Sequence, residues 1–448
     1  MSDTLSPSLL PLTPFEEYML ADDRARQPMT FWLKAEVQGR LDRDVWRQAV
    51  DDMLPRHPLL CRLLEGDETA GYHWTAKIGP PPAISWGGPD EPLDFPAGRM
   101  IDLRRQRGLR IWVRGDEHRA TLWFEFHHAC CDGVGAAGFI DDCLNAYAML
   151  VEAAGGSRLR TVDPARLARR GRFGLTWWRR LLRLPQELLA LVGVVEFYSH
   201  RPLSLVDDSD EEDQAADLSA GPLSLSHQFD AEKLQELRSA ARARGATVND
   251  LLVTCLFAAL HDWVAEHKPD AAGKIARVMV PMNLRLPADD ATPAANIVCM
   301  INLDRRMNAK ATVPKLLRLV SLEMGIVKRC RLGLAFHHIL GLAQRLRRIP
   351  RLLPTDRCLA TCVLSNLGEP LVDATIEVDA RRGPLRLQSL ALLPPLRPHT
   401  AAAFGVVTHG TVTTLSMHRD PSLSLQKAED LLRLFSRQIE GCLAGDLL

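Results

Sequence analysis

The residues best suited to chemistry form the run His127-His128-Ala129-Cys130-Cys131-Asp132-Gly133. Chance would produce two histidines followed, after three positions, by Asp-Gly in on the order of one in five hundred chains of this composition. An imidazole presented at a surface crevice can take a proton from an attacking hydroxyl or amine at neutral pH. The motif therefore predicts a general base for a transfer reaction.

Two other interpretations of this motif stay open. The histidine pair could simply end a strand, with an Asx turn closing it. If the segment were helical instead, His128 and Asp132 would share one helix face, and with His127 they would suggest a metal-dependent hydrolase. Gly133 and the strand pattern before it argue against a helix. A Gly-x-Ser-x-Gly nucleophile elbow is absent from the sequence, which weakens an acyl-enzyme mechanism.

The elements around the motif place it between a strand and a helix. Leucine, two phenylalanines and His128 alternate along Ala120–His128, which is typical of a strand with these side chains on one face. The spacing becomes helical after Gly133 and stays so to about Met149. Because a strand end delivers its last side chain to a crevice, this context favours a functional site over a buried structural one.

Both halves of the chain mix strands and helices, so the fold class is α/β (α+β). Cys358–Leu364 is expected to be a strand that enters a turn at Ser365-Asn366-Leu367-Gly368. The other expected strands are Thr30–Val37, Leu109–Val113, Leu223–Phe229, Ile275–Met282, Asn296–Leu303, Phe404–Thr408 and Thr411–Met417, and the other expected helices are Leu41–Met53, Glu232–Ala243, Val248–Trp263, Thr312–Lys328 and Ser424–Leu443.

Length and charge set the domain organisation. The chain has 448 residues, more than one hydrophobic core usually serves, so two domains are expected. The run Asp207–Asp213 holds six acidic residues and indicates a solvated linker, which predicts an N-terminal lobe at 1–205, a linker at 206–220 and a C-terminal lobe at 221–448.

The net charge is zero, with 55 basic and 55 acidic residues, and no basic patch with interleaved aromatics suggests nucleic-acid binding. The N-terminus lacks a signal-peptide pattern, so we expect a cytoplasmic location.

Several segments, read in order, resemble one superfamily. It contains chloramphenicol acetyltransferase, the condensation domains of peptide synthetases, and wax ester synthases. The His-His-x-x-x-Asp-Gly motif is the strongest match, and the weaker ones are Thr13-Pro14-Phe15-Glu16-Glu17-Tyr18-Met19-Leu20, Pro28-Met29-Thr30, Arg56-His57-Pro58-Leu59-Leu60, Gly245-Ala246-Thr247-Val248-Asn249-Asp250, Val280-Pro281-Met282-Asn283-Leu284-Arg285 and Ser365-Asn366-Leu367-Gly368.

This resemblance implies both a fold and an activity. The fold would be two chloramphenicol-acetyltransferase-like lobes, each a mixed sheet with flanking helices, with a channel between them. The activity would be transfer of an acyl group from acyl-CoA or an acyl-carrier protein to an alcohol or amine. His128 would be the general base, and Asp132 would pair with an arginine of the other half, for which Arg285 is the candidate.

The remaining site residues follow from the same resemblance and from position. His127 and Gly133 would support the motif. Asn296, Ser365 and Asn366 are expected at strand ends or turns that line the channel, where Ser365 and Asn366 could donate hydrogen bonds to an oxyanion. We expect no metal and no permanently bound cofactor, since the thioester enters as a co-substrate. A non-catalytic or regulatory member of the same fold is the remaining alternative.

Residues 166–198 are rich in arginine and contain Trp177, Trp178 and an apolar run from Leu188 to Val195. Basic amphipathic stretches with tryptophan can lie on membranes or lipid droplets, and this segment predicts such a peripheral contact. The alternative is that it forms helices packed on the lobes with solvated arginines.

Overall fold

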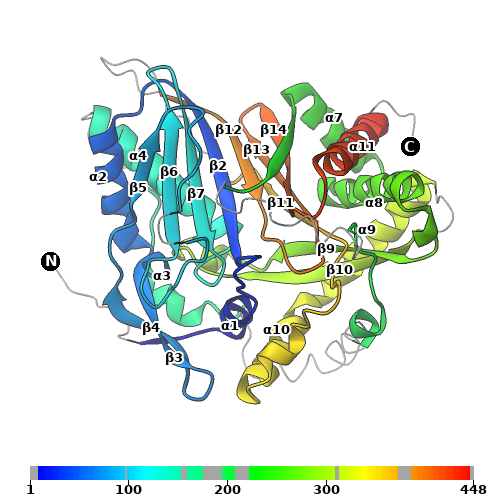
Figure 1. The fold of residues 1–448 in the computed structure, drawn as a ribbon, viewed down its shortest axis with the longest axis horizontal. Coiled ribbons are helices and arrows are strands. Elements are labelled where there is room, and N and C mark those ends of the chain that lie inside the picture. Colours follow the sequence, from blue (N-terminus) through cyan, green and yellow to red (C-terminus); the bar gives the residue numbers. More distant parts are fainter. Residues whose placement is uncertain are drawn as a thin grey trace.

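The structure, a computed structural model, describes residues 9–95, 98–152, 159–174, 193, 195–206, 221–307, 312–371 and 385–443. In these ranges the chain forms two lobes that lie side by side, each built around a β-sheet with helices on its outer face (Figure 1). The two large hydrophobic cores correspond to the two lobes. The predicted fold class and the two-lobed architecture are confirmed.

The first lobe holds a five-stranded sheet of order β12-β2-β7-β6-β5 and a small sheet of order β1-β4-β3. Alternate residues of β7 face the helices: Phe124 packs edge-on against Trp46, and Phe126 packs against Phe139. The elements of this lobe are β1 (Leu10–Pro11), α1 (Pro14–Ala21), β2 (Thr30–Gln38), α2 (Arg43–Met53), α3 (Pro58–Cys61), β3 (Arg62–Asp67), β4 (Gly71–Ile78), β5 (Ile84–Gly87), β6 (Leu109–Gly115), β7 (Arg119–His127) and α4 (Gly133–Glu152).

The second lobe holds a six-stranded sheet of order β10-β9-β11-β13-β14-β8. Strand β11 runs parallel to both of its neighbours, and the other pairs are antiparallel. Its elements are β8 (Ser224–Phe229), α7 (Ala231–Ala243), α8 (Val248–His267), β9 (Ile275–Asn283), β10 (Val298–Arg306), α9 (Val313–Cys330), α10 (Gly333–Arg345), β11 (Cys362–Gly368), β12 (Arg386–Leu393), β13 (Ala402–His409), β14 (Val412–Arg419) and α11 (Leu425–Leu443), of which β12 joins the sheet of the first lobe.

The turn predicted at Ser365-Asn366-Leu367-Gly368 is wrong. These residues continue strand β11, where Ser365 pairs with Gly405 and Asn366 with Val406 of the parallel strand β13. The irregularity lies only at the end, where the register shifts and Gly368 adopts a positive φ of 65°. Local turn propensity was overridden here because β13 supplies strand partners for Ser365, Asn366 and Gly368.

Strand β12 crosses between the halves of the chain. It comes from the second half, yet it pairs antiparallel with β2 at the edge of the first lobe's sheet. In Figure 1 it lies between β2 and β13. The division at 1–205 and 221–448 therefore does not separate the two lobes cleanly, because the first lobe needs a strand from the second segment. The predicted linker at 206–220 lies, except for Val206, outside the described residues and stays a prediction.

The two sheets are in close contact where Gly405 of β13 faces the carbonyl of Leu392 in β12. A Cβ atom at Gly405 would overlap that carbonyl oxygen. The same oxygen accepts a hydrogen bond from the hydroxyl of Ser416, which fixes the contact from a third strand. The relative position of the lobes thus depends on a glycine whose φ is ordinary but whose missing side chain leaves room for backbone.

Gly405→Ala is expected to lower the free energy of unfolding by about 1–3 kcal/mol, because backbone of β12 or β13 must shift to admit the methyl group. Urea denaturation followed by circular dichroism measures this loss. The matched control is Gly325→Ala in α9, where the nearest heavy atom to a new Cβ lies 3.9 Å away and no loss is expected. Equal stability of the two variants would contradict the assigned contact.

The basic segment at 166–198 lies mostly outside the described residues, including Trp177, Trp178 and the apolar run up to 192. One of its arginines, Arg170, is not available for a membrane surface. Its buried guanidinium donates to both carboxylate oxygens of Glu16, at 2.6 and 2.7 Å. The peripheral membrane contact stays a prediction for the remainder of this segment.

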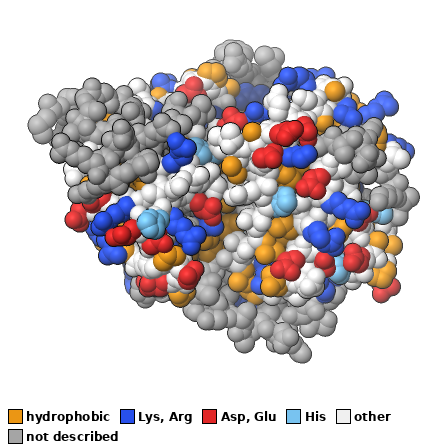
Figure 2. Space-filling view, turned by 90° about the horizontal axis from the view of Figure 1, so that it is seen from above, with side chains coloured by type: hydrophobic (Ala, Val, Ile, Leu, Met, Phe, Trp, Pro, Cys, Tyr) orange, Lys and Arg blue, Asp and Glu red, His pale blue; other side chains and the backbone are white. Residues whose placement is uncertain are grey.

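Two helices, α4 and α8, are long and apolar enough to cross a membrane by composition, but most of each is buried inside its lobe. Their apolar character is explained by packing, since helix–helix and helix–sheet contacts surround them. On the face shown in Figure 2, acidic and basic side chains are intermixed. This face therefore presents no extended field of one sign.

Candidate active site

The turn that carries the histidine motif is held by hydrogen bonds to its main chain from both lobes. The N–H of His128 donates to the carbonyl of Met29 at 2.8 Å. From the second lobe, the amide of Asn296 donates to the carbonyls of His128 and Ala129, at 2.8 and 3.1 Å. Asn296 is 2% exposed and lies behind the turn. The sequence predicts that it lines the channel; instead it positions the main chain of His128.

His127 is fully buried and both of its ring nitrogens are occupied. Nδ1 accepts a hydrogen bond from the N–H of Ala129, at 3.1 Å. That assigns the ring proton to Nε2, which donates to the carboxylate of Asp23 at 3.3 Å. Asp23 in turn accepts from the N–H of Met29 at 2.8 Å. His127 therefore connects the motif to the loop before β2.

His128 projects into a cavity of about 110 Å³ at the junction of the lobes. Phe31 and Phe15 meet its imidazole edge-on, with ring centroids at 5.1 and 6.1 Å. Its buried Nδ1 has no hydrogen-bond partner among the described residues. Burial lowers the pKa of His128 below 6.5, against the opposing pull of its own carbonyl, Asp132 and Asn296. The imidazole is thus neutral at neutral pH and able to accept a proton.

This lowered pKa predicts the acidic limb of the activity profile. If the neutral form of His128 is required, the half-maximal point of the acidic limb of kcat/KM for acyl transfer should lie below pH 6.5, the ordinary pKa of histidine. The sign follows from burial, which disfavours the charged imidazolium and moves its titration downward. A pH series with a fixed acyl thioester measures this. A half-maximal point above pH 6.5 would contradict the assignment.

Asp132 and Arg285 form the ion pair that the sequence predicted between the two halves. The guanidinium donates to both carboxylate oxygens, at 2.8 and 2.9 Å. Asp132 also caps helix α4 by accepting from the N–H of Gly135, and it accepts from the N–H of Ile297, both at 2.8 Å. One carboxylate therefore fixes the helix that follows the motif, the loop before β10 and the end of β9.

The other predicted site residues lie on the wall of the cavity. Gly133, Ser365 and Asn366 all line it. A Cβ atom at Gly133 would lie 2.8 Å from the side chain of Leu367 on β11, so glycine permits the close approach of α4 and β11. The Oδ1 atom of Asn366 accepts from the N–H of Gly368 at 2.9 Å, which orients its amide beside the cavity.

Sequence reasoning missed a second ionic contact on the cavity wall. Arg397, which follows β12, pairs with Asp22 after α1 at 2.5 Å and donates to the hydroxyl of Tyr18 at 3.2 Å. Burial raises the pKa of Tyr18 to about 12. All three residues line the cavity. Little in the sequence indicated this contact, because Arg397 stands near no motif. Arg397 reaches Asp22 only because β12, which precedes it, pairs with β2 of the first lobe.

His57, in a segment that resembles the superfamily, contacts the loop behind the histidine turn. Nδ1 of His57 accepts from the N–H of Ala294 at 3.0 Å, and Nε2 donates to the carboxylate of Asp142 at 3.0 Å. Arg56 contacts the same carboxylate at 3.4 Å. Since Ala294 begins the loop that leads to Asn296, His57 connects the first lobe to the loop behind the histidine turn.

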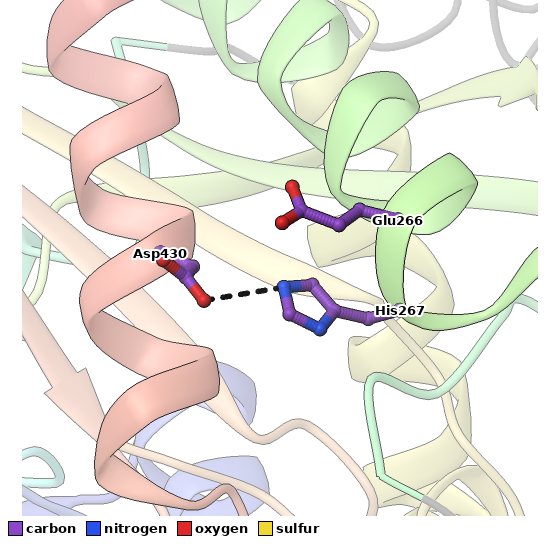
Figure 3. A group of neighbouring side chains, drawn as sticks. All are labelled: Glu266, His267 and Asp430. Carbon is purple, nitrogen blue, oxygen red and sulfur yellow. Dashed lines mark ion pairs between the residues drawn. The ribbon is translucent and has the colours of Figure 1, made fainter.

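The metal hypothesis is not supported by the arrangement of donors. His127 uses both ring nitrogens, and the carboxylate of Asp132 is taken by Arg285 and two backbone amides. Within the described ranges, three potential ligand atoms converge only at Glu266, His267 and Asp430, where α8 faces α11 (Figure 3). None of these three residues lines the His128 cavity, and Asp430 already pairs with His267 and Arg433, at 3.4 and 3.1 Å.

Comparisons with known proteins bear on the fold. The first condensation domain of the CDA synthetase superposes with a TM-score of 0.67 and 16% identity, covering 99% of this chain and 98% of that one. A mutant starter condensation domain of rhizomide synthetase, in complex with C8-CoA and Leu-SNAC, superposes with a TM-score of 0.66 and 13% identity, covering 98% of this chain and 94% of that one. Polyketide synthase associated protein 5 from Mycobacterium tuberculosis superposes with a TM-score of 0.58 and 14% identity, covering 95% of this chain and 96% of that one.

The protein therefore has the condensation-domain fold, with two chloramphenicol-acetyltransferase-like lobes, over nearly its whole length. The resemblance read from the sequence is confirmed at this level. In sequence, the uncharacterized protein Rv2305 of Mycobacterium tuberculosis is 25% identical over 393 residues, which are 82% of this chain and 84% of that protein. No family model matches the chain.

Proposed function

We propose that this protein is an acyltransferase that moves an acyl group from a thioester to an alcohol or amine. The observation that carries the proposal is His128: a neutral, partly buried imidazole that lines a cavity between two lobes and whose main chain is fixed from both sides. The fold it sits in is that of condensation domains, which supports acyl transfer as the general class of reaction.

In the proposed step, His128 removes the proton from the acceptor hydroxyl or amine as that atom attacks the thioester carbonyl. The carbonyl oxygen becomes an oxyanion, and Ser365 and Asn366 on the facing wall are the candidate donors to it. Collapse of the tetrahedral intermediate breaks the carbon–sulfur bond. The imidazolium returns its proton to the departing thiolate, so the products are an ester or amide and a free thiol.

The acyl donor is a thioester of coenzyme A or of a carrier protein. The starter condensation domain of rhizomide synthetase binds C8-CoA and Leu-SNAC in its complex, which supports thioesters as the substrate class for this fold. Residues lining the cavity come from both halves of the chain, including Phe15 and Met29 in the first and Pro281 and Val363 in the second. Such a junction allows two separate substrates to reach one imidazole. A channel open at two faces stays a prediction.

The test is product analysis. The purified full chain is incubated with a mixture of acyl-CoAs and of alcohols and amines, and the products are identified by mass spectrometry. We expect new esters or amides together with free CoA. The same reaction with a carrier-protein thioester covers the second donor. Absence of any condensed product with both donors, or equal product from a His128→Ala variant, would overturn the proposal.

A further inference from the structure

A second, larger cavity adjoins the one that holds His128. Its volume is about 550 Å³, against about 110 Å³ beside the imidazole, and Tyr18, Met279 and Met300 line both. The two spaces therefore adjoin at these three residues, which we call the neck. The smaller cavity has room for the reacting groups alone, whereas the larger one falls in the range of small-molecule binding sites.

The larger cavity, which we call the side arm, follows the face of β9 and β10 that carries Arg277, Met279 and Met300, opposite the face whose alternate residues join the core of the second lobe. Met279 and Met300 lie on neighbouring strands, offset by two positions in the antiparallel register. Pro281 lines the His128 cavity and Arg277 lines the side arm, and four residues of strand β9, or about 13 Å, separate them. Phe336 and Ile339 of α10 form part of the opposite wall.

Four of the five charged side chains that line the side arm form ion pairs with one another. Arg277 donates to both carboxylate oxygens of Asp304, at 2.7 and 2.8 Å. Arg305 donates to Glu323 at 2.9 Å. Glu196 adds a further negative charge among the lining residues. Two arginines against three carboxylates give no excess of positive charge, so the arm is a poor site for the phosphates of coenzyme A.

We propose that the side arm holds an uncharged alkyl chain of one of the two substrates, so that the protein selects lipid-like rather than small polar partners. The inference rests on the proposed acyl transfer at His128. Methionine, phenylalanine and isoleucine side chains around the neck and wall supply apolar, adaptable surface for such a chain. The chain belongs either to the acyl donor or to an alcohol or amine acceptor, and the experiment distinguishes the two.

The test uses Ile339→Trp, which enlarges a partly buried residue that lines the side arm and does not line the His128 cavity. Initial rates are measured for acetyl-CoA and dodecanoyl-CoA with one short acceptor, and for short and long alcohols and amines with acetyl-CoA. In either the acyl-CoA series or the acceptor series, the ratio of the long-chain rate to the short-chain rate should be at least about tenfold lower in Ile339→Trp than in the unaltered protein. Loss of two buried methylene contacts suffices for that factor.

The matched control is Leu322→Trp, on the exposed outer face of α9 and outside the lining of the arm. It should leave both rate ratios unchanged. A change confined to the acyl series assigns the chain to the donor, and one confined to the acceptor series assigns it to the acceptor. Unchanged ratios in both series would overturn the side-arm proposal while leaving acyl transfer intact.

A binding measurement separates this proposal from the proposed reaction. Displacement of a fluorescent fatty acid by dodecanoate is followed in the unaltered protein, in Ile339→Trp and in His128→Ala. We expect weaker binding, by about tenfold, in Ile339→Trp and unchanged binding in His128→Ala. That pattern supports the side arm even if no transfer is detected. Equal affinity in all three proteins would overturn the side arm, whatever the outcome of the product analysis.

Discussion

His128→Ala is expected to lower kcat/KM for acyl transfer by about 10²–10⁴ while leaving the fold intact, since a positioned general base contributes a factor of that size. The imidazole faces a cavity, and its Nδ1 has no hydrogen-bond partner among the described residues. Steady-state rates with the donor and acceptor found by product analysis measure the effect, and the thermal unfolding temperature checks the fold.

Two further histidine variants serve as comparisons for His128→Ala. His118→Ala removes an exposed imidazole from the turn between β6 and β7, and its rate should equal that of the unaltered protein. His127→Ala removes a buried ring that bonds Asp23 and Ala129, so it should lower stability as well as activity. Partial recovery of His128→Ala by added imidazole would support the proton-transfer role. Near-normal turnover of His128→Ala would exclude His128 as the base.

Removing either partner of the Asp132–Arg285 pair should cost about 3–5 kcal/mol of unfolding free energy, because the remaining charge stays buried without its counter-ion. The side chains are only 5% and 12% exposed, so solvent compensates little. Activity should fall in both variants, since the pair joins the histidine turn to the second lobe. Urea denaturation of Asp132→Ala and Arg285→Ala measures the two losses.

The double variant decides whether the two losses have one cause. Its cost should be smaller than the sum of the single costs, as expected for side chains in direct contact. Asp132→Ala should be the more damaging single change, because the carboxylate also accepts from the N–H groups of Gly135 and Ile297. Glu65→Gln, in an exposed pair with Lys77, serves as a control of little expected effect. Strict additivity would contradict a coupled pair.

Much of the local structure was readable from the sequence, because hydrophobic period and capping chemistry act over a few residues. Ala120–His128 was predicted as a strand, and β7 spans Arg119–His127; the helix after Gly133 also forms. The hairpin of β13 and β14 turns at Gly410, whose φ of 56° suits glycine.

The pairing of Asp132 with Arg285 was predicted from a resemblance rather than from spacing. The two residues stand 153 positions apart, and no local pattern connects them. The segments that resemble the superfamily occur in the same order in this chain. That order was enough to identify the motif and its candidate partner. Which atoms meet, and that Asp132 also caps α4, required the folded arrangement.

What the sequence by itself determined is the histidine motif, its place between a strand and a helix, and most of the elements around it. Only the tertiary structure decided that β12 leaves its own half, that Asn296 lies behind His128, and that Arg397 reaches Asp22. The physical reason is that strand pairing and ion pairing between distant segments depend on which surfaces meet when both cores are buried. Periodicity within one segment carries no information about its partner in the other lobe.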